Sequence, residues 1–230
     1  GYSFAGGGHR GRNGAMPRND GGPSRSSPQD RSCFWDLTDT RSPYNGHMSE
    51  LSSLAEEIGV SERTLRRAAQ EGALHANWSS PRRIQISAAE KSYVRRSWKL
   101  FSRLREVLRT EKNLSFVALI GSTARGEDQT GSDVDLIVGL REPDFDQLLR
   151  LELKLEDALG RRTDLLALEQ AHSKPELMAE LVEEGRVVID REKLWPELRS
   201  QTPALLRAAE RSERSRRRQA LAGIDRIRER

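Results

Sequence analysis

Two short apolar runs separated by a polar stretch stand at the centre of the chain. The run SFVALI covers residues 115–120 and is of strand length, and the run VDLIV covers residues 134–138. Gly121 and Ser122 follow the first run and open a polar segment that can begin a helix. The stretch Leu114–Val138 therefore predicts strand, turn, short helix and strand, and we expect the rest of the chain to be organised around it.

Downstream of this stretch the pattern alternates between helical and strand spacing. Apolar residues predict a helix over about 143–159, ended by Gly160, then a strand over 161–168, a helix over 175–184 and a short strand over 186–189. The inward face of the first of these helices is expected to comprise Phe145, Leu148, Leu149, Leu151, Leu155 and Leu159. Residues 111–190 thus predict an α/β (α+β) domain with a small mixed sheet.

Upstream, two short helices are predicted around a glycine-containing turn. Residues 51–58 carry apolar positions at helical spacing, Gly59 makes a turn, and Ser61 is a plausible N-cap for a helix over 62–70 that buries Leu65 and two alanines. The phrase LAEEIGVSERTLRRAAQEG resembles the helix-turn-helix of many bacterial regulators.

Residues 78–86, WSSPRRIQI, predict a short wing, and Ser87 and Glu90 predict a capping box for a helix of about 22 residues that ends near Arg109. Residues 48–110 therefore predict a mostly α winged helix-turn-helix domain with a connector helix, in which Trp98 is a core or interdomain anchor. A protein-docking module is the alternative. The residues expected to contact DNA are Arg63, Thr64, Arg66, Arg67, Arg82 and Arg83.

The two ends of the chain differ from the middle. Residues 1–47 are rich in Gly, Ser, Pro, Arg and Asn and lack periodicity, which predicts a disordered leader, and we expect the native start at Met48. The alternative for this segment is an RGG-like nucleic-acid arm around Arg10 and Arg12. Residues 191–230 predict a charged helical tail that begins with a linker at Pro196 and Pro203. The tail is interpreted as a partly ordered helix, a docking helix or a basic contact to nucleic acid.

Composition narrows the class of protein. Hydrophobic residues make up 35% and charged residues 32%, and Cys33 is the single cysteine, which excludes an internal disulfide framework and favours a reducing compartment. No apolar run approaches the ~20 residues that span a bilayer, so we expect a cytoplasmic protein without a membrane partner. Residues 114–190 carry 17 Asp and Glu against 8 Lys and Arg, whereas residues 51–110 and 191–230 each carry 12 Lys and Arg against 6 acids. Basic flanks of this kind suit contact with a phosphate backbone.

The second apolar run begins with two carboxylates. Asp133 and Asp135 point to the same side of a strand, roughly 6.5 to 7 Å apart. Two carboxylates at this distance repel each other unless a positive charge lies between them. Mg²⁺, which takes one or two carboxylates together with substrate phosphates, matches these ligands.

The pair Gly121-Ser122, ten residues and then Asp133-Val134-Asp135 resemble the signature of the DNA-polymerase-β-like nucleotidyltransferases. The fuller string GSTARGEDQTGSDVDLIV is similar to the minimal nucleotidyltransferases, including the antitoxins paired with HEPN-domain toxins. The resemblance covers about 75 residues, and both motifs stand at the boundary of a predicted strand.

The resemblance implies a role for several residues. Gly121 and Ser122 would hold the triphosphate, and Arg125 would either contact phosphate or pair with Glu127 or Asp128. Two Mg²⁺ ions would be bound by the carboxylates Asp133, Asp135 and Asp164, of which Asp164 also takes the proton of the attacking hydroxyl. Glu169 is the less favoured substitute for Asp164.

The resemblance thus implies a Mg²⁺-dependent enzyme that moves a nucleoside monophosphate, most simply AMP from ATP, to a hydroxyl of a protein acceptor. The acceptor is a toxin-like protein or the chain itself, and the N-terminal domain binds DNA. The alternatives are a non-catalytic DNA-binding regulator with a nucleotide-sensing domain, and a nucleotidyltransferase for a small molecule such as an antibiotic. The base preference, the DNA site and the oligomeric state are left open, with an oligomer as one option.

Overall fold

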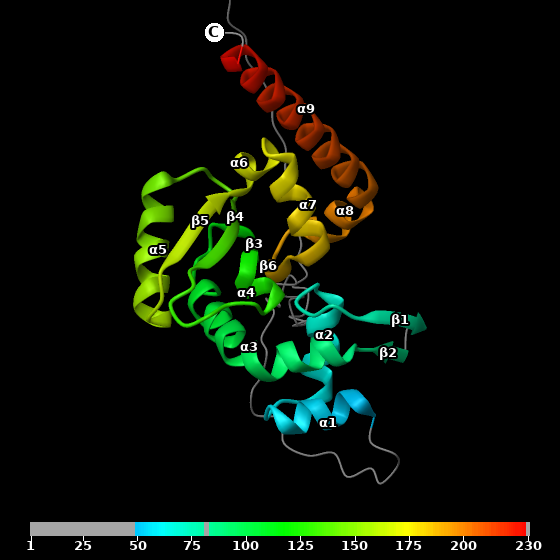
Figure 1. Cartoon of the computed structure of the whole chain (residues 1–230). Coiled ribbons are helices and arrows are strands. Elements are labelled where there is room, and N and C mark those ends of the chain that lie inside the picture. The colour runs from blue at the N-terminus through cyan, green and yellow to red at the C-terminus, as the bar shows by residue number, and fades with distance from the viewer. Residues whose placement is uncertain (1–48, 81–82, 229–230) are drawn as a thin grey trace, which may run out of the picture. The chain divides into compact units, whose positions relative to one another are not determined.

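The computed structural model describes residues 49–80 and 83–228 (Figure 1). These residues all belong to one compact unit, Trp35–Arg230. The predicted leader over 1–47, the expected start at Met48, and Arg82 lie outside the described residues.

A four-stranded mixed sheet forms the centre of the C-terminal part of the chain. Its strands lie in the order β5 (Thr163–Ala167), β4 (Val134–Leu140), β3 (Leu114–Ile120) and β6 (Arg186–Asp190). Strand β3 runs antiparallel to both β4 and β6, and β4 pairs with β5 in parallel. The prediction of a small mixed sheet is therefore confirmed, with β3 between two neighbours and buried along its whole length.

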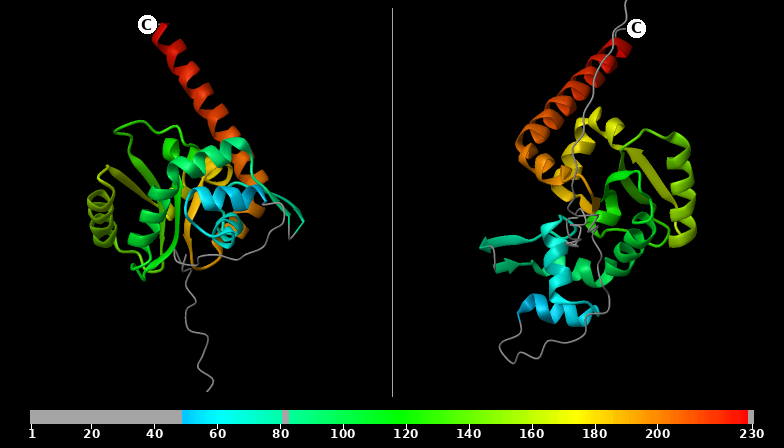
Figure 2. Two further views of the ribbon diagram at one scale, coloured as in Figure 1. Left: turned by 90° about the horizontal axis from the view of Figure 1, so that it is seen from below. Right: turned by 180° about the vertical axis from the view of Figure 1, so that it is seen from behind.

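Helices cover both faces of this sheet, as Figures 1 and 2 show. Because side chains alternate along a strand, Val117 and Leu119 of β3 pack into one core and Phe116 and Ala118 into another. The first core lies under α3 (Ala88–Leu108) and α5 (Phe145–Leu159). The second lies under α6 (Leu168–His172), α7 (Pro175–Glu184) and α8 (Leu194–Ser200).

The N-terminal elements are two helices and a hairpin. Helix α1 (Glu50–Glu57) and helix α2 (Glu62–Gln70) are followed by β1 (Asn77–Ser80) and β2 (Arg83–Gln85), which pair antiparallel. The Ser61 hydroxyl caps α2 by accepting the Thr64 amide at 3.1 Å, as the sequence predicted for this N-cap. Leu65 is fully buried, and the core of these helices continues along α3 to the sheet.

The same elements hydrogen-bond to the outer edge of β6. The Val187 amide donates to the Gly72 carbonyl at 3.0 Å, and Arg105 Nε of α3 donates to the Val188 carbonyl at 2.7 Å. Edge strands expose unpaired backbone groups, so these bonds close an edge that would otherwise be open.

The predicted capping box at the start of α3 is half right. The Ser87 hydroxyl accepts the Glu90 amide at 3.1 Å, as expected. The Glu90 carboxylate, however, does not return to the Ser87 amide but turns inward, where it binds Arg186 of β6 and accepts the His75 amide at 3.0 Å. An ion pair in the interior outcompetes the local cap, because a buried guanidinium needs an anion.

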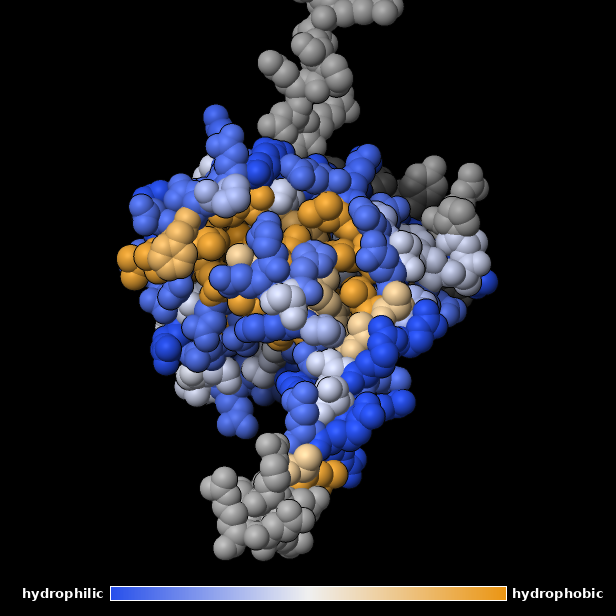
Figure 3. Space-filling view, turned by 90° about the horizontal axis from the view of Figure 1, so that it is seen from above, coloured by the Kyte–Doolittle hydropathy of each residue, from blue (hydrophilic) through white to orange (hydrophobic). Residues whose placement is uncertain are grey.

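Two expectations about residues 143–168 are wrong in detail. In α5 the core takes Leu151 and Leu155, whereas Phe145 is 72% exposed and Leu149 46% exposed. Leu148 and Leu159 are partly buried and pack against the same core, as expected. Figure 3 shows apolar residues gathered on the face seen from above. The predicted strand over 161–168 is shorter than expected, because Leu168 already begins α6.

The C-terminal residues are helical throughout their described part. Pro196 lies in the first turn of α8 and Pro203 in the first turn of α9 (Thr202–Arg228), so the two prolines start helices instead of marking a linker. Helix α9 runs without a break through the polar residues 211–218. Arg216 pairs with Glu176 at 2.6 Å, which ties α9 to α7. Within residues 49–80 and 83–228, no helix is apolar and long enough to cross a bilayer.

Candidate active site

Three aspartates lie on adjacent strands at one edge region of the sheet. Asp133 directly precedes β4, Asp135 is the second residue of β4, and Asp164 is the second residue of β5. Asp135 and Asp164 are register partners in the parallel pair, and neighbouring strands are about 4.8 Å apart. Asp135 lies on the same face of β4 as Ile137, whose core lies under α6 and α7. The three carboxylates therefore share one face, with Asp164 exposed and the other two half-buried.

The acidic groups of this cluster carry negative charge that Arg125 compensates only in part. Burial raises the pKa of the Asp135 carboxyl above its usual range, and Asp164, Asp133 and Glu180 add to the effect, while Arg125 opposes it. A carboxylate in such surroundings is stabilised by any cation that binds there. The cluster thus attracts a positive ligand.

The carboxylate oxygens of this cluster suit a Mg²⁺ ion that takes its remaining ligands from the substrate. In the part of the chain that the structure describes, no three His, Cys, Asp or Glu side chains converge closely enough to hold an ion by themselves. Mg²⁺ commonly uses one or two carboxylates and takes its remaining ligands from phosphates and water. The arrangement of Asp133, Asp135 and Asp164 agrees with that mode.

The turn after β3 brings the backbone against this cluster. Helix α4 (Gly121–Arg125) starts at Gly121, which has φ 72°. A Cβ at position 121 would lie 2.4 Å from Asp135 Oδ2. Glycine is therefore required at this position for two reasons, the left-handed backbone and the close approach to the carboxylate.

Carboxylates of α7 contact the same turn. Glu180 Oε1 accepts the Gly121 amide at 3.1 Å and Arg125 Nη1 at 3.1 Å. Arg125 Nη1 also donates to Glu184 at 3.1 Å, and its Nε donates to Glu127 at 2.7 Å. Of the two ion pairs that the sequence offered for Arg125, the one with Glu127 is present. The guanidinium therefore lies beside the Gly121 amide and is held there by three glutamates.

Arg161 braces the loop that carries Asp133. Its guanidinium donates to the Ser132 carbonyl at 2.7 and 3.0 Å and to Asp128 at 3.0 Å. The buried Thr123 hydroxyl donates to the Asp133 carbonyl at 3.1 Å. These bonds join α4, the loop and the segment just before β5, so one network fixes the backbone at Asp133.

Arg186 supports the other end of α4. Its side chain is buried, and its Nε donates to the Ala124 carbonyl at 2.6 Å while its other nitrogens bind Glu90. The guanidinium lies over the Tyr93 ring, 3.4 Å from the centroid. The phosphate-binding turn predicted from the sequence thus rests on an ion pair between α3 and β6.

Sequence reasoning missed Glu180, Arg161 and Arg186. Each lies on another element and reaches the site through a contact distant in sequence, which no local pattern reports. The only local signal was the i, i+4 spacing of Glu180 and Glu184, which puts both on one side of α7. Glu169, the substitute considered for Asp164, lies exposed in the first turn of α6.

The residues predicted to contact DNA have different surroundings. Arg63 and Arg83 are exposed. Arg66 pairs with Glu62 and Arg67 with Glu71, each at 2.8 Å within the helical region. Thr64, one of the residues expected to contact DNA, is only 7% exposed, and its hydroxyl lies 2.9 Å from the hydroxyl of the N-cap residue Ser61. The side chain therefore does not point outward as a contact with DNA requires.

Comparison with known proteins adds independent evidence. Residues 102–194 match the family model described as "Polymerase beta, Nucleotidyltransferase". Two proteins of Methanocaldococcus jannaschii, each named "Putative protein adenylyltransferase", align with the chain. The first is 35% identical over 85 residues, which is 33% of this chain and 85% of the relative. The second is 32% identical over 83 residues, again 33% of this chain and 85% of the relative.

Solved structures with a similar arrangement have low sequence identity. A toxin-antitoxin structure with AMP-PNP gives a TM-score of 0.45 at 20% identity and covers 53% of this chain and 98% of that chain. A structure of the tri-AMPylated Shewanella oneidensis HEPN toxin in complex with the MNT antitoxin gives a TM-score of 0.43 at 18% identity, with coverage of 54% and 98%. The family model covers the sheet, the glycine turn and the three aspartates together, and the chain accordingly belongs to the polymerase β nucleotidyltransferase family.

Proposed function

We propose that the chain transfers AMP from ATP to a hydroxyl group of a protein acceptor, as an antitoxin-like protein adenylyltransferase. The observation that carries this proposal is the register pairing of Asp135 with Asp164 beside the Gly121 turn. The pairing brings carboxylates and a close backbone approach to one place, which is what transfer of a nucleotidyl group requires.

Each residue has a part in the transfer. The Gly121 amide and the Ser122 hydroxyl hold phosphate oxygens of ATP, and Arg125, beside that amide, neutralises further phosphate charge. Asp164 is the most exposed of the three aspartates and takes the proton from the attacking hydroxyl, which then bonds to the α-phosphorus while pyrophosphate leaves.

Asp133, Asp135 and Asp164 would hold Mg²⁺ jointly with phosphate oxygens of ATP and water, with two ions in the complete site. Bound there, the metal would neutralise charge on the phosphates and on the attacking oxygen. Arg161 and Thr123 hold the loop of Asp133 in place for this role. Their bonds to the loop lie within the protein, so the loop is positioned before metal or nucleotide binds.

A protein acceptor is supported by the size of the relatives. The first relative named as a protein adenylyltransferase matches over 85 residues, which is 85% of its length, so that protein is only about 100 residues long. A unit of this size has little chain for a pocket that recognises a small acceptor, which favours an acceptor that brings its own surface.

Intact-mass spectrometry tests this proposal. The chain is incubated with ATP and Mg²⁺, alone and with the protein encoded by the neighbouring gene, and each protein is weighed before and after. We expect one of the two to gain the mass of one or more AMP groups, with the site on Tyr, Ser or Thr. If neither gains mass while the chain binds ATP, the function is that of a nucleotide-sensing regulator.

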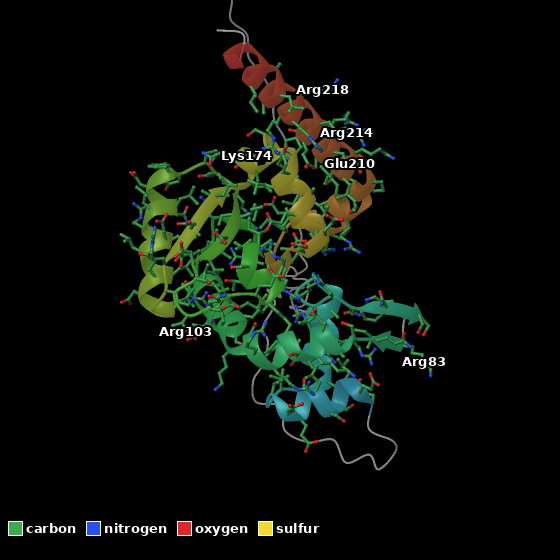
Figure 4. The ribbon with its side chains drawn as sticks, in the orientation of Figure 1. Arg83, Arg103, Lys174, Glu210, Arg214 and Arg218 are labelled. Atoms are coloured by element: carbon green, nitrogen blue, oxygen red, sulfur yellow. The ribbon has the colours of Figure 1, made fainter. Side chains whose placement is uncertain are left out.

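We also propose that the N-terminal elements are a winged helix-turn-helix that binds DNA. Its support is the N-capped α2 preceded by the Gly59 turn, the β1–β2 hairpin, and the exposed Arg63 and Arg83, of which Arg83 is labelled in Figure 4. Arg66 and Arg67 each have a glutamate within the same region, so they contribute less charge to a backbone contact than the count of arginines indicates.

Salt-dependent binding to a labelled double-stranded DNA fragment tests the second proposal. Arg63→Ala and Arg83→Ala should each weaken binding and reduce the slope of log K against log salt by about 0.9 if one phosphate contact is lost. Arg103→Ala, an exposed arginine of α3 labelled in Figure 4, serves as the matched control. Equal loss in all three variants would point to a nonspecific effect of charge and would contradict the assignment.

A further inference from the structure

Glu180 contacts two of the three groups that we assign to the phosphates of the nucleotide. Its Oε1 atom accepts the Gly121 amide and Arg125 Nη1, each at 3.1 Å. One of these donors is charged, and hydrogen bonds between charged partners are about twice as strong as neutral ones. A single carboxylate oxygen therefore occupies an anion position made by a backbone N–H and a guanidinium.

The surroundings of Glu180 make this position unusual for a carboxylate. Glu180 is one of the charges that disfavour the ionised form of Asp135, so it stands close to the aspartate cluster. A further negative charge beside three aspartates is unfavourable unless donors hold it there. The Gly121 amide and Arg125 are the donors that do so, and they are the ones that the nucleotide needs.

Glu180 and the nucleotide compete directly for the Gly121 amide. An N–H group donates well to one acceptor at a time, so Glu180 Oε1 and a phosphate oxygen exclude each other at this position. Arg125 is different, because a guanidinium has five N–H donors and already serves Glu127 and Glu184 as well. Exchange at Gly121 thus decides whether the turn holds Glu180 or the nucleotide.

We propose that Glu180 is a built-in competitor of the triphosphate. In the absence of nucleotide it satisfies the Gly121 amide and keeps Arg125 beside the turn, and a phosphate oxygen must replace it before ATP is bound in the productive position. This inference rests on the proposed nucleotidyl transfer and adds to it the residue of α7 that sets the affinity for the triphosphate.

A supporting role for Glu180 makes the opposite prediction. If the carboxylate were needed to hold the turn open for phosphate, or to hold the metal with the aspartates, its removal would weaken ATP binding. The sign of the change in Kd therefore separates the two roles. A merely structural contribution would not tighten binding.

The experiment measures the Kd of ATP with Mg²⁺ by isothermal titration calorimetry on the full chain. The variants are Glu180→Ala and the isosteric Glu180→Gln, with Glu183→Gln as the control, because Glu183 is an exposed glutamate of the same helix. We expect Glu180→Ala to lower Kd about tenfold, which is 1.4 kcal/mol. Glu180→Gln should lower it by a smaller factor, since its amide oxygen competes without a charge, and Glu183→Gln should leave it unchanged.

Titration with adenosine, which lacks phosphates, tests whether the change in Kd depends on the phosphates. Because Glu180 competes only for phosphate positions, the Kd of adenosine should be the same in wild type and Glu180→Ala. A Kd for ATP that is unchanged or higher in both Glu180 variants overturns the inference while leaving the proposed function intact. Absence of ATP binding in wild type and in every variant overturns the proposed function as well, whereas binding by the variants alone supports the inference.

Discussion

Replacement of Glu90 by glutamine tests how the N-terminal elements support the site. The Glu90 side chain is 5% exposed and that of Arg186 is 4% exposed, and the two make bonds of 2.5 and 2.9 Å. Glu90→Gln keeps the shape and one acceptor oxygen but removes the charge. The Arg186 guanidinium is then left buried without an anion.

The structure sets the size of the effect. Removal of one partner from a buried ion pair typically costs about 3–5 kcal/mol. Two contacts reduce this cost: the Tyr93 ring under the guanidinium, where a desolvated cation–π contact is worth roughly 2 kcal/mol, and the Ala124 carbonyl. We therefore expect a loss of about 1–3 kcal/mol in the free energy of unfolding. For a chain of this size, each kcal/mol lowers Tm by about 2–4 °C.

Urea denaturation and calorimetry measure the loss directly. Glu57→Gln is the matched control, because Glu57 is exposed and pairs with Arg95 on the surface, and it should leave Tm unchanged. The double variant Glu90→Gln/Arg186→Met should be more stable than Glu90→Gln alone, since it removes the orphaned charge. A Glu90→Gln protein as stable as the control would refute the reasoning that this pair holds α3 to β6.

Three further predictions concern the site and its support. Asp135→Asn should stabilise the protein in urea denaturation near pH 7, because burial and the acidic neighbours raise the pKa of the Asp135 carboxyl; typical gains of this kind are roughly 0.5–2 kcal/mol. The gain should shrink as pH falls and wild-type Asp135 becomes protonated. A variant less stable than wild type would contradict an unfavourable charge at this position. Burial raises the pKa of Tyr93 to about 12, so the contribution of this side chain to stability is full below pH 10 and is lost as pH rises to 12. In urea denaturation, Tyr93→Phe should therefore make the free energy of unfolding depend less on pH over that window. The same pH dependence in wild type and variant would refute this. Gly121→Ala places a Cβ against Asp135 Oδ2 at positive φ, so it should lower the free energy of unfolding by about 1–3 kcal/mol and abolish ATP binding in calorimetry. Gly131→Ala is the control, because Gly131 also has positive φ but open space around it, and this variant should still bind ATP.

Much of the sheet and its carboxylates could be predicted from sequence because local signals agree there. The apolar runs, the glycine turn and the helix over 175–184 coincide with β3, β4 and α7 within a residue or two. The alternation of strand side chains placed Asp133 and Asp135 on one side without further information. These elements could therefore be predicted from local sequence patterns alone.

What sequence could not predict depends on long-range contacts. Glu90 has the spacing of a capping box, yet the buried Arg186 captures it across 96 positions of the chain. Thr64 follows arginine on a polar stretch and still lies buried at the N-cap. In α5, Phe145 and Leu149 match a helical stripe, but the sheet offers room only for Leu151, Leu155 and their neighbours. In each case, packing partners from distant segments decide between local alternatives.

Transfer of label from ATP tests the central claim most directly. The chain and its candidate acceptor are incubated with Mg²⁺ and ATP labelled either at the α-phosphate or at the γ-phosphate, using wild type, Asp135→Asn and the surface control Glu183→Gln. We expect protein-bound label from α-labelled ATP alone, in wild type and in Glu183→Gln, and none in Asp135→Asn although that variant stays folded. Label from the γ-phosphate, or undiminished transfer by Asp135→Asn, would contradict nucleotidyl transfer at this site.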